Sequence, residues 1–324
     1  MRRPVASLSL DLDNQWSYMK THGDAGWETY PSYLDVLVPR VLEFLKVRGL
    51  TITVFIVGKD ASLPKNRRAI ASIASEGHEI ANHSFSHEPW LHVYSEEEIE
   101  REIVSAEEAI ESATGRRPLG FRGPGFSLSA STLRVLARRG YLYDASTLPT
   151  FLGPLARAYY LLTSRLSREE LRQREALFGS FREGLRPLRP YCWHTSESEL
   201  IEIPVTTMPL FRLPIHASYV VYLSKFSRPL ALAYFRAALA FCRVAGVQPS
   251  LLLHPLDFLG CDDIKELSFF PGMDLPSKRK TETVGQIVDL LAAKFTITTM
   301  HAHAHAARAL ALRSVEPNFP SIQI

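Results

Sequence analysis

The chain has 324 residues, of which 46% are hydrophobic and 22% are charged, and its formal net charge is +3. This composition is that of an ordinary folded protein with a sizeable core, which excludes a disordered or fibrous chain. The small net charge and the lack of a compact basic stripe with interleaved aromatic residues argue against a nucleic-acid-binding protein.

The first half of the chain alternates between short strands and amphipathic helices. Residues 5–10 have the apolar alternation of a strand, and residues 33–48 carry apolar residues at helical spacing before Gly49. Residues 51–58 are rich in β-branched residues, which predicts a strand buried on both faces. The pattern continues with helices expected at 66–76, 95–114 and 129–139 and strands at 78–82, 119–122 and 141–144. This order predicts parallel strands covered by helices.

The alternation breaks between residues 150 and 220. Residues 150–190 hold an apolar, tyrosine-rich segment, a charged helical pattern and a connector rich in proline and arginine, which indicates an insertion. Later elements are expected as strands at 200–205, 250–255 and 295–300 and helices at 230–245 and 283–294. We therefore predict a single α/β barrel domain over residues 1–310, with a helical insertion at about 150–220, and a C-terminal tail over residues 311–324.

Several features bear on the compartment. The spacing of the three cysteines fits neither a zinc motif nor a disulfide framework, which is consistent with a reducing environment. The N-terminal residues lack the apolar core and cleavage site of a signal peptide, and no run of about 18 apolar residues predicts a membrane-spanning helix. We expect a cytoplasmic protein. Residues 151–166 are amphipathic, and packing as core or lid is favoured over peripheral membrane contact, which would suit a lipid-linked sugar.

Polar clusters follow the predicted strands, at the end where barrels build their active sites. Asp11 and Asp13 follow the first strand, and carboxylates at positions i and i+2 can point to the same side, although a turn is the alternative interpretation. His83 and His87 could share a metal ion if they lay on one helical turn; two histidines of a surface loop are the alternative. Together with Asp13, they would leave coordination positions open for water and substrate, as catalytic metal sites do.

Two further clusters follow later strands. Arg122, in the sequence Arg-Gly-Pro-Gly, could hold a carboxylate bidentately or could be a structural arginine at a turn. His254, in Leu-Leu-His-Pro, is a candidate general acid, although a histidine at a strand end is usually a packing residue. Asp144 ends another predicted strand and could orient His254 by accepting its ring N–H.

Two other groups of residues have weaker signals. Trp16, Tyr18, His22 and Asp24 could form the rim of a sugar site or could equally pack within a loop. The alternating histidines of residues 301–305 resemble a metal-binding tract, but the alternation near the chain end favours a frayed strand or a loop.

In chain order, the segments DLD, HSFSH, RGPG, YDAS and LLHP resemble the motifs of the polysaccharide deacetylase family, also called the NodB-homology family or carbohydrate esterase family four. The likeness runs from about residue 5 to 300 and leaves 150–220 outside the common pattern. It implies a distorted (β/α)7 barrel of the polysaccharide deacetylase type. It also implies a divalent metal ion, zinc first, with cobalt, nickel, manganese or iron as alternatives.

The resemblance further implies that one aspartate binds the metal and the other acts as base. We assign Asp13 to the metal, with His83 and His87, and Asp11 to the base, with the reverse assignment as the main alternative. The implied reaction removes an N-acyl group, acetyl first, from an amino sugar in a polysaccharide or lipid-linked glycan. Arg122 would orient Asp11, and His254, held by Asp144, would protonate the departing amine.

The first motif departs from the adjacent aspartates that are usual in the family, because Leu12 separates Asp11 from Asp13. This spacing resembles the branch of intracellular peptidoglycan deacetylases, allantoinase-like cyclic amidases and the lipid A pathway deformylase, so it leaves the substrate open. A deformylase or cyclic amidase acting on a small or lipid-linked substrate is therefore the first alternative. A carbohydrate-binding protein without catalysis is the second, and the retained aspartates and histidines argue against it.

Overall fold

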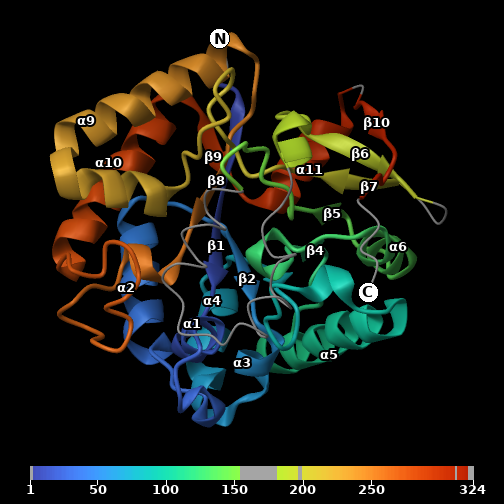
Figure 1. The fold of residues 1–324 in the computed structure, drawn as a ribbon, viewed down its shortest axis with the longest axis horizontal. Coiled ribbons are helices and arrows are strands. Elements are labelled where there is room, and N and C mark those ends of the chain that lie inside the picture. The colour runs from blue at the N-terminus through green and yellow to red at the C-terminus, as the bar shows by residue number, and fades with distance from the viewer. Residues whose placement is uncertain (1–2, 154–180, 196–198, 311, 320–324) are drawn as a thin grey trace.

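The computed structural model describes residues 3–153, 181–195, 199–310 and 312–319, which form an α/β fold on one sheet (Figure 1). The ten strands run in the order β10-β6-β7-β5-β4-β3-β2-β1-β8, and β9 pairs with β1 off this path. The pairs are parallel except that β6 and β7 are antiparallel. The strands are β1 (Val5–Leu12), β2 (Thr53–Ile56), β3 (Glu79–Asn82), β4 (Gly120–Phe121), β5 (Tyr143–Asp144), β6 (Tyr191–His194), β7 (Glu199–Glu202), β8 (Ser250–Leu253), β9 (Thr296–Thr298) and β10 (Ser314–Val315).

Hydrogen bonds beyond β7 connect that strand's continuation to the far end of the sheet. Thr206 donates its backbone N–H to the carbonyl of Ser250 (3.1 Å), and the N–H of Ser250 donates to Oγ1 of Thr206 (2.7 Å). Because Ser250 begins β8, these bonds close the curved sheet in the manner of a barrel. The predicted α/β architecture with parallel strands is confirmed.

The two faces of β1 lie in different environments. Leu8 and Leu10 point outward into the main hydrophobic core, where they meet the apolar faces of helices. Ser7 and Ser9 point the opposite way and form hydrogen bonds with side chains of distant elements. Asp11 continues this polar row because alternate residues of a strand share a face. The row of polar side chains therefore runs through the barrel interior to its mouth.

Helices surround the sheet, with α2, α9 and α10 on one side and α5 and α6 on the other in Figure 1. The helices are α1 (Gln15–His22), α2 (Leu34–Val47), α3 (Gly58–Ser62), α4 (Arg67–Ser75), α5 (Glu96–Thr114), α6 (Ala130–Arg138), α9 (Ala217–Val244), α10 (Ser277–Lys294) and α11 (Met300–Arg308). The capping box of Ser95 and Glu98 begins α5 as the sequence indicates. By contrast, α9 begins before the expected residue 230 and has a kink at Ser227, two residues before Pro229.

The histidine run at 301–305 forms the start of helix α11, so the expected strand or loop is wrong. Thr299 caps this helix by accepting the N–H of Ala302, and alanine favours helix formation. Its buried residues, among them Met300, His303 and Ala304, follow helical spacing, which the simple alternation of histidine and alanine obscured. His303 lies 2.9 Å from the hydroxyl of Ser7 and packs in the barrel interior.

The sheet extends into both ranges that were predicted to lie outside the regular barrel. Strands β6 and β7 fall within the expected insertion at 150–220, and β10 falls within the expected tail and pairs with β6. The charged helical pattern and most of the amphipathic segment 151–166 fall outside the described residues. None of the described helices combines the length and the apolar character needed to cross a bilayer. Membrane contact and cytoplasmic location stay predictions.

Candidate active site

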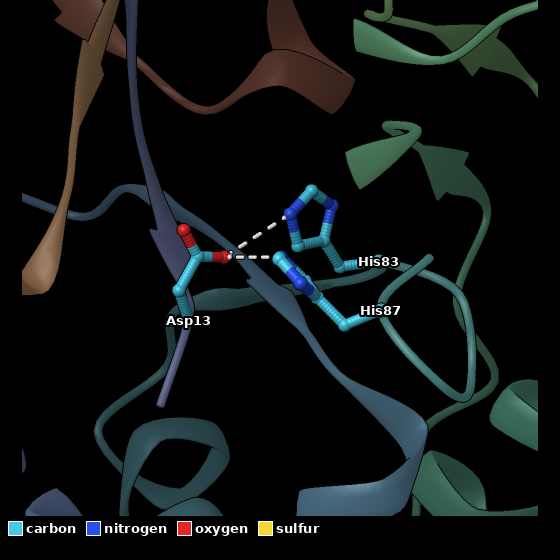
Figure 2. Close-up of side chains that lie close together, drawn as sticks. All are labelled: Asp13, His83 and His87. Atoms are coloured by element: carbon cyan, nitrogen blue, oxygen red, sulfur yellow. Dashed lines mark hydrogen bonds and ion pairs between the residues drawn. The ribbon is translucent and has the colours of Figure 1, made fainter. Parts of the chain in front are cut away.

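Asp13, His83 and His87 converge at the mouth of the barrel, and all three are buried (Figure 2). Asp13 follows β1, and the two histidines follow β3, which is separated from β1 only by β2. Oδ1 of Asp13 lies 2.9 Å from Nε2 of His87 and 3.3 Å from Nε2 of His83. The structure therefore brings together the three residues predicted to bind the metal.

The loop that carries the histidines is not the helical turn suggested by their spacing. Ser84 and His87 have positive φ angles of 60° and 51°, in the left-handed region. The backbone is held there because Oδ1 of Asn82 accepts the N–H of Ser84, and Oε2 of Glu102 in α5 accepts two more loop N–H groups. These bonds offset left-handed conformations that cost roughly 1–3 kcal/mol per residue. The expected backbone geometry is wrong, but the imidazoles still meet.

The histidine ring nitrogens are oriented as metal ligands require. Nδ1 of His83 lies 2.6 Å from the carbonyl oxygen of Arg122, so this nitrogen carries a proton and Nε2 faces Asp13. A bare nitrogen lone pair facing a carboxylate is repulsive unless a cation or a proton lies between them. Nδ1 of His87 is buried and has no hydrogen-bond partner among the described residues.

The electrostatics of the cluster also favour a positive charge among the three side chains. Burial acts to raise the pKa of Asp13, but the imidazoles of His87 and His83 outweigh it and hold the pKa well below its usual range. Burial acts to lower the pKa of His83, and the carboxylates of Asp11 and Asp13 raise it above the usual value. Two imidazoles and one carboxylate form a donor set suited to zinc and related divalent ions. The residues therefore fit a metal ion.

Asp11 lies beside this cluster and is held by Arg122. Nη1 of Arg122 donates to Oδ1 of Asp11 (2.5 Å) and to the hydroxyl of Ser9 (3.0 Å), and both members of the ion pair are buried. The guanidinium also packs over the ring of Phe55, with 4.2 Å between its carbon and the ring centroid. The contact uses one nitrogen rather than the bidentate geometry that arginine permits. Arg122 thus contacts Asp11, as predicted, and fixes the orientation of its carboxylate.

His254 follows β8, which pairs with β1 so that Leu253 lies opposite Leu10. This register places His254 level with Asp11 on the neighbouring strand. Nδ1 of His254 lies 2.9 Å from the hydroxyl of Ser218, at the start of α9.

The predicted contact between Asp144 and His254 is wrong. Oδ1 of Asp144 instead accepts the hydroxyl proton of Ser146 (2.6 Å), and Nδ1 of His254 is engaged by Ser218. Burial and the nearby carboxylate of Glu202 raise the pKa of Asp144 well above its usual range. Asp144 is therefore placed to hold the β5 end of the sheet rather than to orient His254.

The residues after the first motif have mixed roles. Tyr18 of α1 donates its hydroxyl proton to Oδ2 of Asp13 (3.2 Å), so it touches the site. Trp16 is buried and donates to Asp60, and His22 stacks on Phe269 with 3.6 Å between ring centroids. These two pack within the fold rather than forming a sugar-binding rim.

Sequence reasoning missed three polar residues around the site. Tyr33 donates to the backbone carbonyl of Asp13 (2.7 Å), and Asp60 accepts hydrogen bonds from Asn14 and Trp16. The third is Ser218, whose hydroxyl contacts His254. Asp60 follows a buried strand and could have been found by that signal, whereas Tyr33 and Ser218 sit in ordinary helix-start positions.

Residues 24–143 match the model of the polysaccharide deacetylase family. The match shows that this part of the chain, 120 of the 324 residues, is similar to the polysaccharide deacetylase family. The matched range contains His83, His87 and Arg122, whereas Asp11, Asp13 and His254 lie outside it.

Two curated relatives are similar to about half of the chain. A peptidoglycan deacetylase-like protein of Gibberella zeae is 34% identical over 171 residues, which cover 49% of this chain and 47% of the relative. The peptidoglycan deacetylase of Helicobacter pylori is 30% identical over 157 residues, which cover 46% of this chain and 52% of the relative. The chain spans about half the length of the curated relatives it matches.

A solved structure supports the fold over the whole chain. A crystal structure described as that of a polysaccharide deacetylase from Mycobacterium smegmatis aligns with a TM-score of 0.65 and 20% identity, covering 100% of this chain and 96% of the other chain. At this identity the likeness shows the fold alone. The expected barrel of the polysaccharide deacetylase type is confirmed.

Proposed function

We propose that this protein is a metal-dependent hydrolase that removes an N-acyl group, acetyl in the first place, from an amino sugar in a polysaccharide or lipid-linked glycan. The observation that carries the proposal is the convergence of Asp13, His83 and His87 beside the Arg122–Asp11 ion pair. The peptidoglycan deacetylases among the relatives support an amino-sugar substrate.

Asp13, His83 and His87 would hold the metal ion, for which zinc is our first proposal. When bound, such an ion polarises an amide carbonyl and lowers the pKa of a bound water molecule. The hydrogen bond from Nδ1 of His83 to the carbonyl of Arg122 keeps Nε2 free as a ligand atom. Three protein ligands leave room for water and substrate, as catalytic sites require.

Asp11 acts as the base in this proposal. Its Oδ1 is engaged by Arg122, so Oδ2 is the oxygen available to take the proton of the attacking water. Arg122 is fully buried and is fixed by its bonds to Ser9 and to the carbonyl of Ala145, so it holds Asp11 in one orientation. This preorganisation is what a proton transfer at a defined atom needs.

His254 supplies the proton to the departing amine. An amine leaves poorly as an anion, so a positioned acid contributes about 100-fold or more to such a step. Nδ1 of His254 is engaged by Ser218, so Nε2 is the ring nitrogen that gives up the proton.

The test combines a metal assay with product analysis. The protein is stripped with a chelator, reloaded with zinc, cobalt, nickel, manganese or iron, and its metal content is measured by mass spectrometry. Each form is then incubated with N-acetylglucosamine oligomers, peptidoglycan fragments and their N-formyl analogues. We expect equal amounts of free amine and acetate from the metal-loaded form and none from the stripped form. A metal-loaded protein that releases amine from none of these sugars would contradict the proposal.

A further inference from the structure

His254 has a polar support that neither the motifs nor Asp144 supplies. Ser218 lies at the second position of α9, and its hydroxyl oxygen is 2.9 Å from Nδ1 of His254. Asp257 ends the short 3-10 helix η7 (Pro255–Asp257), and its Oδ2 accepts the backbone N–H of His254 (2.7 Å). Burial raises the pKa of the Asp257 carboxyl, and a hydrogen bond from the Ser218 hydroxyl acts to lower it. The three side chains therefore form one connected group.

The direction of these hydrogen bonds follows from the protonation state that the reaction needs. A histidine that acts as acid carries a proton on both ring nitrogens, and then Nδ1 can only donate. Ser218 must accept that proton at its oxygen, so its own hydroxyl proton has to point elsewhere. The buried carboxylate of Asp257 is the acceptor next to it.

We propose that Ser218 and Asp257 are the positioning residues that hold His254 in its proton-donating state, with Nδ1–H bound to Ser218 and Nε2–H free for the departing amine. This inference rests on the proposed function. The carboxyl of Asp257 reaches the imidazole of His254 only through the hydroxyl of Ser218. It therefore fixes the orientation of the ring and lies near the charge of the imidazole without forming a direct ion pair.

The surroundings of His254 keep this arrangement rigid. Lys280 of α10 is fully buried, and its Nζ donates to the carbonyls of Leu256 and Leu259 (2.9 Å each), which fixes the segment that follows His254. Burial lowers the pKa of Lys280 to about 8, although the nearby carboxylates act to raise it.

The remaining titratable neighbours are two rings. The ring of His216 lies 6.0 Å from that of His254, and burial, together with the charge of His254, lowers its pKa to about 3. Tyr18 of α1 keeps its proton, because burial and the charges of Asp13 and Asp257 raise its pKa. Asp257 is thus the carboxyl that faces His254, and a positive charge on His254 acts to lower the pKa of Asp257.

The test substitutes the hydroxyl and compares kinetic and spectroscopic readouts. We expect Ser218→Ala to lower kcat about 10-fold or more with KM changed less than about twofold, because the acid acts on the chemical step. The alkaline limb of the pH–rate profile should move to lower pH. Ser218→Thr keeps a hydroxyl and should restore most of the lost kcat. Asp257→Asn keeps an acceptor for the backbone N–H of His254 and should give an intermediate loss.

Ser224→Ala is the matched control. Ser224 lies on the same helix and is buried, and among the described residues its hydroxyl bonds only to the carbonyl of Val221, so its loss removes a similar hydroxyl without touching His254. In 15N-edited NMR spectra of the zinc-loaded protein, a slowly exchanging Nδ1 proton of His254 should be present in the wild type and absent in Ser218→Ala. Assignment comes from His254→Gln.

The outcomes separate this inference from the proposed function. If Ser218→Ala matches Ser224→Ala in kcat and keeps the Nδ1 signal, the positioning role is overturned while deacylation stands. If the wild type deacylates no amino sugar but its Nδ1 signal still depends on Ser218, the proposed function is overturned and the contact stands. A loss in Ser218→Ala that Ser218→Thr does not restore would also contradict the role of the hydroxyl.

Discussion

The carboxyl ends of β1 and β3 and those of β5 and β8 both carry residues that the motifs single out, but they differ in which contacts form. β1 and β3 are separated only by β2, and Asp13 meets His83 and His87 directly. β5 and β8 are likewise separated only by the strand that contains β7, because Thr206 and Ser250 close the barrel, yet Asp144 and His254 bond to Ser146 and Ser218 instead. Strand order thus predicts which side chains come near one another, whereas local hydrogen-bond partners decide which contacts form.

The largest losses of metal binding and turnover are expected at His83 and His87, which contact Asp13 directly. His83→Ala and His87→Ala should each abolish metal binding and lower turnover at least about 1,000-fold, because one of three protein ligands is lost. Metal content by mass spectrometry and amine release check this together. His301→Ala, which removes a partly exposed imidazole on α11, is the control and should keep both. Full activity of a metal-free His87→Ala protein would reject the mechanism.

A second substitution separates the two aspartates. Asp11→Asn should bind metal as well as the wild type and lose about 100- to 10,000-fold in kcat, because only the base is removed. Asp13→Asn should lose metal affinity instead. The opposite pattern would show that the roles are exchanged, so metal titration and kinetics of both variants decide the assignment.

The strand-end region of β5 and β8 is tested by comparing substitutions of Asp144 and His254. His254→Gln should lower kcat about 100-fold with the metal retained. Asp144→Asn should change kcat less than about fivefold, because Asp144 has no described hydrogen bond to His254 and its raised pKa favours a neutral side chain that asparagine mimics. Equal losses in the two variants would restore the direct partnership that the sequence suggested. Thermal melts of both proteins control for misfolding.

The extent of what the sequence predicts follows from these same residues. Strand and helix periodicity predicted parallel strands covered by helices, and the family resemblance implied the barrel. The spacing in Asp11-Leu12-Asp13 placed both carboxylates on one face because strand side chains alternate. Ser218 could not be found in this way, because its contact with His254 depends on where α9 begins, and that helix starts before its apolar pattern becomes clear. The prediction for the histidines of α11 was wrong for a related reason, because the strict alternation of histidine and alanine concealed the helical spacing of the buried residues.

The smallest effect is expected away from both regions, at Glu107 of α5. Burial acts to raise the pKa of this carboxyl, but its bonds to Arg139 and Arg117 outweigh burial and lower it. Glu107→Gln should therefore cost about 1 kcal/mol of stability near neutral pH, discounted because both arginines are partly exposed, and should leave kcat unchanged.

A carboxyl with a lowered folded pKa stabilises the protein above the unfolded pKa, and this contribution is lost as the pH falls through the folded pKa. The wild type and Glu107→Gln should thus differ in denaturant midpoint at about pH 7 and converge at about pH 3. A gap that persists in acid would show that the arginines contribute through packing rather than charge. A change in kcat would show that the ion pair of Glu107 is coupled to the active site. Effects on kcat would then no longer be confined to the two strand-end regions.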